Sequence, residues 1–183
     1  MAELGESSYR RFLQADPQAL EEMVRTYSDG LVRFVYGYVR DSAAAEDVAA
    51  EAIATLFLRK LRFEDEPRMR GYLYKIARSR AVDYLRRHKQ EVPLEDVENV
   101  LYAEDSQHLL ERRMRNEAVW RCMQKLPQQY REVLQLAYFD GFSLEQTAKI
   151  LSKTMKQIYN LHSRAKAALR VLLEQEEIIF EEL

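Results

Sequence analysis

Hydrophobic residues recur at intervals of three and four along most of the chain, which is the spacing of one face of an α-helix. One such run extends over residues 20–38 and a second over 48–61. A third lies within 68–89, and further runs follow between 109 and 172. Every periodic segment is of this helical kind, so the pattern predicts an all-α protein.

Signals for the start of a helix divide this pattern into separate elements. Asp16 precedes Pro17, which suits an N-capping residue followed by the first helical position. Asp41 and Ser42 begin the second long helix, and Pro67 opens the third. We therefore expect three long helices with short connections in the first part of the chain.

The helical periodicity is lost in residues 90–106, which contain six acidic residues and no basic one. We interpret this segment as an acidic linker between two small helical domains, residues 7–89 and 107–173. It is either a passive solvated tether or a tether with a binding role of its own. Residues 174–183 form an acidic tail that contains the apolar patch Ile178–Phe180.

Two capping boxes, eleven residues apart, mark the second domain. Ser143 is followed three residues later by Gln146, and Thr154 is followed in the same way by Gln157. In such a box the hydroxyl caps the helix and the glutamine side chain bonds back to the capping residue. The two boxes predict a short helix before a long one, which is the arrangement of a helix-turn-helix.

The second helix of this motif, residues 155–173, has one apolar and one polar face. The polar face carries lysine, asparagine, serine and arginine side chains, which suit hydrogen bonds to base edges and phosphates of DNA. The alternative is an ordinary amphipathic helix with a solvated polar face. The turn before this helix lacks glycine, so Ser152 or Lys153 must take the turn conformation.

The distribution of charge favours nucleic-acid binding more than the total charge does. The 183 residues carry a net charge of −2, which alone does not indicate a nucleic-acid-binding protein. Residues 68–89 carry +7 and residues 142–173 carry +5, which leaves −14 for the rest of the chain. Two basic segments therefore lie in an acidic background, and each coincides with a predicted helix.

The predicted helix at 68–89 has a charged face that also carries Tyr72. A basic surface with an aromatic ring suits single-stranded nucleic acid, because bases stack on the ring and cations follow the phosphates. Tyr74 and Tyr84 fall on the apolar side of the same helix. We expect these two tyrosines to pack in the core.

Arg80 also falls on the apolar side of this helix, so we expect a structural role rather than a contact with DNA. A guanidinium in that position needs a carboxylate. Asp83 on the same helix, or Asp47 or Glu51 on the preceding one, could supply it.

Few features favour an enzyme, a cofactor or a metal site. Cys122 is the only cysteine, which excludes an intrachain disulfide and a cysteine cluster, and we expect it to pack on a helix face. His88, His108 and His162 are dispersed, and there is no glycine-rich phosphate loop. We therefore expect no catalytic residues and no cofactor. The lack of a signal peptide and of a membrane-spanning apolar run predicts a soluble, cytoplasmic protein.

Three segments of the chain carry a family resemblance; in order, they are AEDVAAEAIATLFLRKL, RGYLYKIARSRAVDYLRRHK and LPQQYREVLQLAYFDGFSLEQTAKIL. They resemble conserved motifs of the bacterial sigma-70 family of RNA polymerase sigma factors. The absence of further domains makes the chain similar to the small extracytoplasmic-function (ECF) type. The resemblance implies a protein that binds core RNA polymerase, directs it to specific promoters and helps to open promoter DNA. It also implies an anti-sigma factor as a partner.

The same resemblance implies a role for each domain. Residues 7–89 would bind the clamp helices of the polymerase through Asp47 and Glu51, and residues 107–173 would bind the polymerase flap. Contacts with the minus-ten promoter element would come from Arg68, Tyr72, Lys75, Arg78, Ser79 and Arg86. Contacts with the minus-thirty-five element would come from Lys153, Lys156, Gln157, Asn160, Ser163 and Arg164.

Three positions depart from the family pattern. Ala50 stands where glutamine is usual, which implies a weaker or redistributed contact with the polymerase. Ser79 replaces an asparagine, so the promoter preference of other members does not transfer to this chain. Tyr72 stands where the family often has a tryptophan, at the strand-opening end of the helix.

Two other classes of function are compatible with a helical, DNA-binding sequence of this kind. A helix-turn-helix regulator that binds DNA as a dimer, without being a polymerase subunit, is the main alternative. It would leave the basic helix at 68–89 without a role. An adaptor that binds only proteins would make both charged faces purely solvated.

Overall fold

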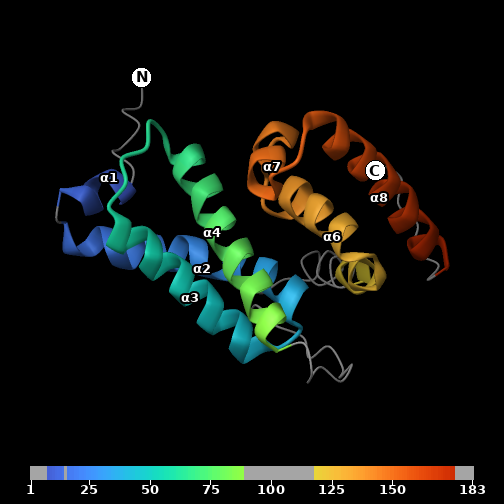
Figure 1. The fold of residues 1–183 in the computed structure, drawn as a ribbon, viewed down its shortest axis with the longest axis horizontal. Helices are drawn as coiled ribbons and strands as arrows, with labels where there is room; N and C mark the ends of the chain where they lie inside the picture. Colours follow the sequence, from blue (N-terminus) through green and yellow to red (C-terminus); the bar gives the residue numbers. More distant parts are fainter. Residues whose placement is uncertain (1–7, 15, 89–117, 176–183) are drawn as a thin grey trace, which may run out of the picture.

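The computed structural model describes residues 8–14, 16–88 and 118–175, and every regular element in these ranges is a helix, which confirms the all-α prediction (Figure 1). The predicted linker and the apolar patch of the tail lie outside the described residues. The N-terminal half, residues 8–88, contains α1 (Ser8–Leu13), α2 (Pro17–Val39), α3 (Ser42–Arg59) and α4 (Glu66–Arg87). The C-terminal half, residues 118–175, contains helical residues 118–125, α6 (Gln128–Leu134), the π-helix η1 (Gln135–Phe139), α7 (Leu144–Leu151) and α8 (Met155–Gln175).

Each long helix of the N-terminal half begins after an aspartate that caps its first turn. The side chains of Asp16, Asp41 and Asp65 accept hydrogen bonds from backbone N–H groups at 2.7 to 3.0 Å. These caps satisfy donors that have no partner within the helix. The first two starts agree with the prediction. The third helix begins slightly earlier than expected, at Glu66, so that Pro67 lies within its first turn.

The core of the N-terminal half lies between α2, α3 and α4. Phe34 of α2, Leu56 of α3 and Leu73 of α4 are each at most 1% exposed. Ala77 and Ala81 of α4 are fully buried, and their small side chains let the neighbouring helices approach closely. These positions follow the helical spacing seen in the sequence, so the apolar stripe of α4 was predictable.

The predicted helix-turn-helix is present as α7 and α8. Both capping boxes form, because Ser143 and Gln146 exchange hydrogen bonds, as do Thr154 and Gln157. Ser152 takes the left-handed turn conformation, with φ of 54°. Of the two residues considered for the turn, Ser152 is therefore the one that adopts it.

Between α6 and α7 the helix widens into the π-helix η1, and the chain then reverses its direction. In η1 the N–H of Asp140 donates to the carbonyl of Gln135, five residues earlier, at 2.9 Å. Gly141 follows with φ of +64°, a conformation that glycine adopts without strain. The N–H of Phe142 then donates to the carbonyl of Leu136 at 2.8 Å. This reversal brings Asp140 and Phe142 to the N-terminal half.

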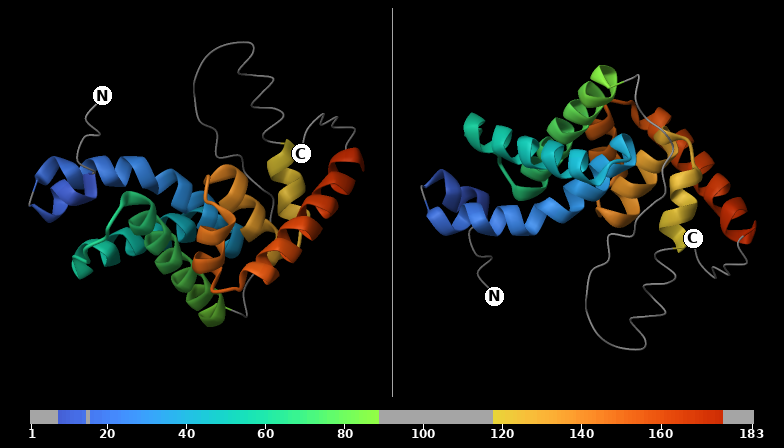
Figure 2. Two further views of the ribbon diagram at one scale, coloured as in Figure 1. Left: turned by 90° about the horizontal axis from the view of Figure 1, so that it is seen from above. Right: turned by 90° about the horizontal axis from the view of Figure 1, so that it is seen from below.

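The two halves pack against each other, with α7 against α4 and α6 against α2 (Figure 2). Val133, Leu136 and Phe142 of the C-terminal half belong to the same apolar cluster as Leu73 and Tyr74 of α4. Tyr74 is only 2% exposed, which confirms its predicted place in the core. The two predicted domains therefore share a continuous apolar contact that no pattern in the sequence indicated.

A second, smaller apolar cluster lies within the C-terminal half. Its buried members are Cys122, Met123, Leu126, Leu134, Ala165, Leu169 and Leu173. Cys122 is fully buried, as expected for a packed side chain. The second half of α8 packs into this smaller cluster. The first half of α8 packs into the larger cluster through Ile158.

Replacing Ser152 by glycine is expected to raise the free energy of unfolding by about 0.5–1 kcal/mol. Glycine removes a left-handed penalty of about 1–2 kcal/mol, although it also makes the unfolded chain more flexible. Urea denaturation of the full chain measures the change. Ser163→Gly, in the middle of α8, is the matched control and should be destabilising. A loss of stability in Ser152→Gly would contradict the assigned turn geometry.

Candidate nucleic-acid interface

The six side chains of α4 predicted to contact the minus-ten element differ in their surroundings. Four of them are exposed: Arg68, Lys75, Ser79 and Arg86. Tyr72 and Arg78 are half-buried. The contacts of these side chains decide what each part of α4 offers to DNA.

The first turns of α4 bring aromatic and basic side chains together. The ring of Tyr72 lies against Phe63, with ring centroids 5.5 Å apart, and its hydroxyl accepts a hydrogen bond from Arg59. Arg68 forms ion pairs with the two acidic residues that precede the helix. This end of α4 therefore combines an aromatic pair with two arginines, which suits base stacking and phosphate contacts.

Arg80 fastens α4 to α3, as expected for a structural arginine. It donates hydrogen bonds to the carboxylate of Glu51 at 2.5 Å and to the hydroxyl of Thr55 at 2.7 Å. Of the three acids considered as its partner, Glu51 is therefore the one that binds it. Asp83 instead forms an ion pair with Arg86 at 3.1 Å.

The two acids predicted to contact the polymerase, Asp47 and Glu51, are exposed on α3. Ala50 is also exposed, so the position where the family usually has glutamine faces solvent. Glu51 is shared with Arg80, whereas Asp47 forms no ion pair within the described residues. Of these two acids, Asp47 is therefore the one with no ion pair among the described residues to give up.

The polar face of α8 is open to solvent. Its exposed members are Lys156, Gln157, Asn160, Ser163 and Arg164, and Lys153 in the preceding turn is half-buried. Ile158, Ala165 and Leu169 are buried on the other side. Gln157 has a second task, because its Oε1 atom accepts a hydrogen bond from the N–H of Thr154 at 2.8 Å. Its NH2 group is then the part that remains for a DNA base.

His162 of α8 is stacked on Tyr138 of η1. The ring centroids are 5.6 Å apart with an interplanar angle of 15°, and the tyrosine hydroxyl lies 3.0 Å from Nε2. Partial burial and the positive charge of Lys166 lower the pKa of His162. The imidazole is therefore neutral at physiological pH and joins α8 to η1.

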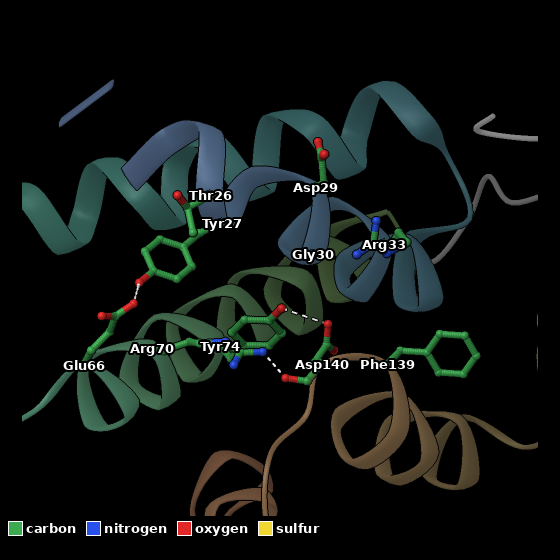
Figure 3. A pocket seen from close by; sticks show the side chains of 10 residues that line it. All are labelled: Thr26, Tyr27, Asp29, Gly30, Arg33, Glu66, Arg70, Tyr74, Phe139 and Asp140. Atoms are coloured by element: carbon green, nitrogen blue, oxygen red, sulfur yellow. Dashed lines mark hydrogen bonds between the residues drawn. The ribbon is translucent and has the colours of Figure 1, made fainter. Parts of the chain in front are cut away.

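Asp140, just before α7, is buried against α4 and α2 (Figure 3). The hydroxyl of Tyr74 donates to its Oδ1 atom at 2.9 Å, and Arg70 donates to its backbone carbonyl. The Arg70 guanidinium also lies over the ring of Phe142, 4.2 Å from the centroid. Gly30 of α2 makes room for this cluster, because a Cβ atom there would lie 2.6 Å from the Tyr74 hydroxyl. A pocket of about 450 Å³ opens beside the cluster.

Burial raises the pKa of Asp140 to about 7. The hydrogen bond from Tyr74 and the positive charges of Arg33 and Arg70 act in the opposite direction but are outweighed. Burial, together with Asp140, also raises the pKa of Tyr74 above its ordinary value. The carboxyl of Asp140 therefore binds a proton near neutral pH when the two halves are packed, whereas an aspartate in water is ionised there.

A second acid of the C-terminal half, Glu132 of α6, is also buried beside α4. Its Oε2 atom lies 3.7 Å from Nε of Arg78. On α2, the carbonyl of Gly37 accepts a hydrogen bond from Arg131 at 3.1 Å. Burial, followed by the positive charge of Arg40, lowers the pKa of Arg131 to about 10. The boundary between the halves is thus lined with polar groups as well as apolar ones.

No local pattern in the sequence indicates that Arg70, Asp140 and Glu132 form these contacts. From the sequence alone, Asp140 is expected to end a helix before Gly141. Arg70 is expected to be one of several positive charges in a basic segment. Glu132 lies in an amphipathic helix, where an acid is ordinary. Their meeting depends on the packing of the halves, which spacing within either half does not encode.

Among residues 8–14, 16–88 and 118–175, no helix is both long and apolar enough to cross a membrane. Within the same ranges, no three or more histidine, cysteine, aspartate or glutamate side chains come together as a metal site.

The fold is similar to that of a chain in each of two solved complexes. The sigma factor RpoE from Bartonella quintana, solved with the anti-sigma factor NepR, gives a TM-score of 0.68 at 20% identity, covering 84% of this chain and 96% of that one. CnrH, solved with the cytosolic domain of CnrY, gives a TM-score of 0.65 at 18% identity, covering 92% of this chain and 96% of that one. At these identities the similarity establishes a common fold.

Sequence relatives extend over nearly the whole chain. The ECF RNA polymerase sigma factor SigM of Bacillus subtilis is 25% identical over 154 residues, which cover 84% of this chain and 94% of SigM. The RNA polymerase sigma-E factor of Streptomyces antibioticus is 27% identical over 166 residues, which cover 90% of each chain.

Two family models match consecutive parts of the chain. The model of sigma-70 region 2 matches residues 23–91, which include α4, and the model of sigma-70 region 4 matches residues 116–169, which include the helix-turn-helix. The two regions occur in the order that the sequence motifs suggested. The chain therefore belongs to the sigma-70 family, as a sigma factor of the ECF type.

Proposed function

We propose that this chain binds core RNA polymerase, directs it to specific promoters and helps to open promoter DNA for transcription initiation. The observation that carries the proposal is the presence of sigma regions 2 and 4 in one chain, with basic side chains exposed on α4 and on α8. A helix-turn-helix regulator that acts without the polymerase is less favoured, because it would leave region 2 without a task. The protein would act in the cytoplasm as an initiation factor, while the polymerase performs the catalysis.

In this proposal, α4 holds the non-template strand of the minus-ten element. Arg68 and Tyr72 would act at the start of the helix, where Phe63 and Arg59 add a second ring and a second charge. An extruded base costs a few kcal/mol to unstack, and stacking on a ring recovers about 1–3 kcal/mol. The aromatic pair therefore accounts for much of the required stabilisation. The other proposed contacts on α4 are Lys75, Arg78, Ser79 and Arg86.

At the upstream element, α8 would enter the major groove of the minus-thirty-five DNA. A recognition helix of this motif contacts base edges with residues near its N-terminus. Lys156, Gln157, Asn160 and Arg164 occupy that part of α8 and are exposed. Lys153 and Ser163 would add contacts with the phosphates.

Two protein partners complete the proposal. The exposed acids Asp47 and Glu51 on α3 would contact the clamp helices of the polymerase. An anti-sigma factor would hold the chain inactive, since a protein of similar fold from Bartonella quintana was solved with the anti-sigma factor NepR. Because the net charge of −2 gives the free chain little attraction for DNA, the polymerase would be needed to bring both basic surfaces to the promoter.

Run-off transcription of DNA from the source genome, with its core polymerase, should depend on this chain. Lys156→Ala or Arg164→Ala should lower promoter-specific transcription about tenfold, because a lost base contact costs about 1–3 kcal/mol. Binding to core polymerase, measured by fluorescence anisotropy, should stay unchanged. Arg121→Ala removes an exposed positive charge outside α8 and is the matched control.

The complementary variant is Asp47→Ala, which should weaken binding to core polymerase and leave recognition of the upstream element intact in the holoenzyme that still forms. The reverse pattern in these variants would overturn the assignment of roles to α3 and α8. Transcription that is independent of the chain at every promoter would contradict the function itself.

Promoter binding should depend on the polymerase at about 150 mM salt, where phosphate contacts are partly screened. The holoenzyme should shift a labelled promoter fragment in a gel-shift titration at concentrations where the isolated chain does not. Tight, sequence-specific binding by the isolated chain would favour the polymerase-independent regulator instead.

A further inference from the structure

The connection between α3 and α4, residues 60–65, carries one ring of the aromatic pair proposed to stack on the minus-ten strand. That ring belongs to Phe63, which lies against Tyr72 of α4. The connection begins at Lys60, whose φ of 44° is a left-handed conformation that lysine adopts only with strain. Residues 61–64 form no backbone-to-backbone hydrogen bond within the described part of the chain. Contacts with side chains from elsewhere must therefore hold Phe63 in place.

Helix α1 lies beside this connection (Figure 1), and two of its side chains supply such contacts. The hydroxyl of Tyr9 donates to the backbone carbonyl of Leu61 at 2.5 Å. The guanidinium of Arg10 donates to the backbone carbonyl of Glu64 at 2.7 Å. The two carbonyls lie on either side of Phe63 in the chain. Consecutive residues of α1 therefore hold the connection on both sides of the aromatic residue.

The same helix completes a row of five aromatic rings that ends at Tyr72. From α3 outward, the rings are those of Phe57, Phe12, Tyr9, Phe63 and Tyr72, and neighbouring ring centroids are 4.6, 6.0, 5.5 and 5.5 Å apart. Aromatic rings attract each other at such separations. Tyr9 is only 3% exposed, so the middle of the row is buried. Phe63 is thus held between a buried ring of α1 and the proposed base-stacking ring of α4.

Helix α1 is itself anchored to α2 by polar contacts. The carboxylate of Glu22 on α2 accepts a hydrogen bond from the hydroxyl of Ser8 at 2.9 Å and forms an ion pair with Arg11. Arg11 also lies 3.6 Å from the carboxylate of Asp16, the residue that caps α2. The position of α1, and of the connection that it holds, is therefore set by a core helix of region 2.

Helix α1 lies outside both family models. The model of region 2 begins to match at residue 23, whereas α1 covers Ser8–Leu13. The matched part of the chain therefore contains Phe63 and Tyr72 but not the helix that holds them.

We propose that α1 is a positioning element for promoter opening, with Tyr9 and Arg10 as the positioning residues. By fixing the connection on both sides of Phe63, they keep its ring beside Tyr72, where an extruded base of the minus-ten strand stacks. Tyr9 and Arg10 act through Phe63 and not by touching DNA. The inference rests on the proposed function, because base stacking at the start of α4 is part of the promoter opening proposed above.

The contribution of α1 lies in what need not be ordered when the DNA arrives. A connection that was free to move would lose conformational entropy as the base left the duplex, and that cost would add to the cost of unstacking. A connection held in advance avoids it. Loss of one hydrogen bond that holds the connection should therefore lower the fraction of holoenzyme competent for opening about fivefold.

Open-complex formation by the holoenzyme tests this role, on a promoter identified by the run-off experiment. Tyr9→Phe keeps the ring and the charge and loses the hydrogen bond to Leu61. Permanganate reactivity of unpaired thymines at the minus-ten element of duplex promoter DNA should fall about fivefold relative to the wild type. Tyr130→Phe removes the hydroxyl of a half-buried tyrosine in the C-terminal half and is the matched control, with unchanged reactivity.

A template that is already unpaired at the minus-ten element separates positioning from a general defect. On this mismatched template, with saturating holoenzyme, Tyr9→Phe should transcribe at the wild-type rate, because unpairing no longer limits the reaction. A variant with a damaged fold or weakened polymerase binding would be defective on both templates. Wild-type permanganate reactivity of Tyr9→Phe on duplex DNA, or a defect of the same size on the mismatched template, would overturn the proposal.

Arg10→Ala tests the other side of the connection. Because its hydrogen bond is exposed, the loss of permanganate reactivity should be smaller, about threefold, and Arg10→Lys should recover most of it by keeping a donor for Glu64. Arg25→Ala removes an exposed positive charge from α2 and is the matched control. An equal defect in Arg25→Ala would assign the effect to charge and contradict positioning.

The two levels of the account fail in different ways. Variants of Tyr9 and Arg10 that open duplex DNA like the wild type, in transcription that depends on the chain, would reject the role of α1 alone. Wild-type transcription that does not depend on the chain on either template would reject the proposed function itself.

Discussion

Helix α4 is packed on two sides, and the rest of the molecule is arranged around that constraint. One side buries Leu73 and the small residues Ala77 and Ala81 against α2 and α3, which fixes the helix within region 2. The other side carries Arg70, Tyr74 and Arg78 toward the acids of region 4. What remains for DNA is the start of the helix and its outer face. The surface that α4 leaves for DNA is therefore limited by two protein contacts, one within region 2 and one with region 4.

The distribution of charge follows the same logic. A sigma factor needs positive surfaces for promoter DNA, yet a strongly basic free chain would bind DNA everywhere. Here the basic segments lie within a chain of net charge −2. In region 2, part of the positive surface is further neutralised by Glu132 of region 4 and by local acids such as Glu51. Selectivity would then come from the polymerase, which holds the two regions at the separation that a promoter demands.

Much of this could be predicted from the sequence, because helices are encoded locally. The caps at Asp16 and Asp41 and the two capping boxes follow from short patterns, whereas the cap at Asp65 was not predicted. The turn could be narrowed to Ser152 or Lys153, and Arg80 could be recognised as structural from its place on the apolar side of α4. The contact between the regions could not be predicted. It depends on the π-helical widening before Asp140 and on the space that Gly30 leaves for Tyr74, and neither is visible in hydrophobic spacing. The specific residues that touch DNA and polymerase stay predictions.

The central property proposed for α4 is that it holds the non-template strand of the minus-ten element. A photo-crosslinking amino acid at the exposed position of Lys75 tests it most directly. In the free chain, mass spectrometry of the cross-linked peptides should place the bond within residues 145–155. In the polymerase–promoter complex, the cross-link should move to the non-template strand of the minus-ten element. A cross-link to region 4 that persists in the promoter complex, with none to DNA, would contradict the account.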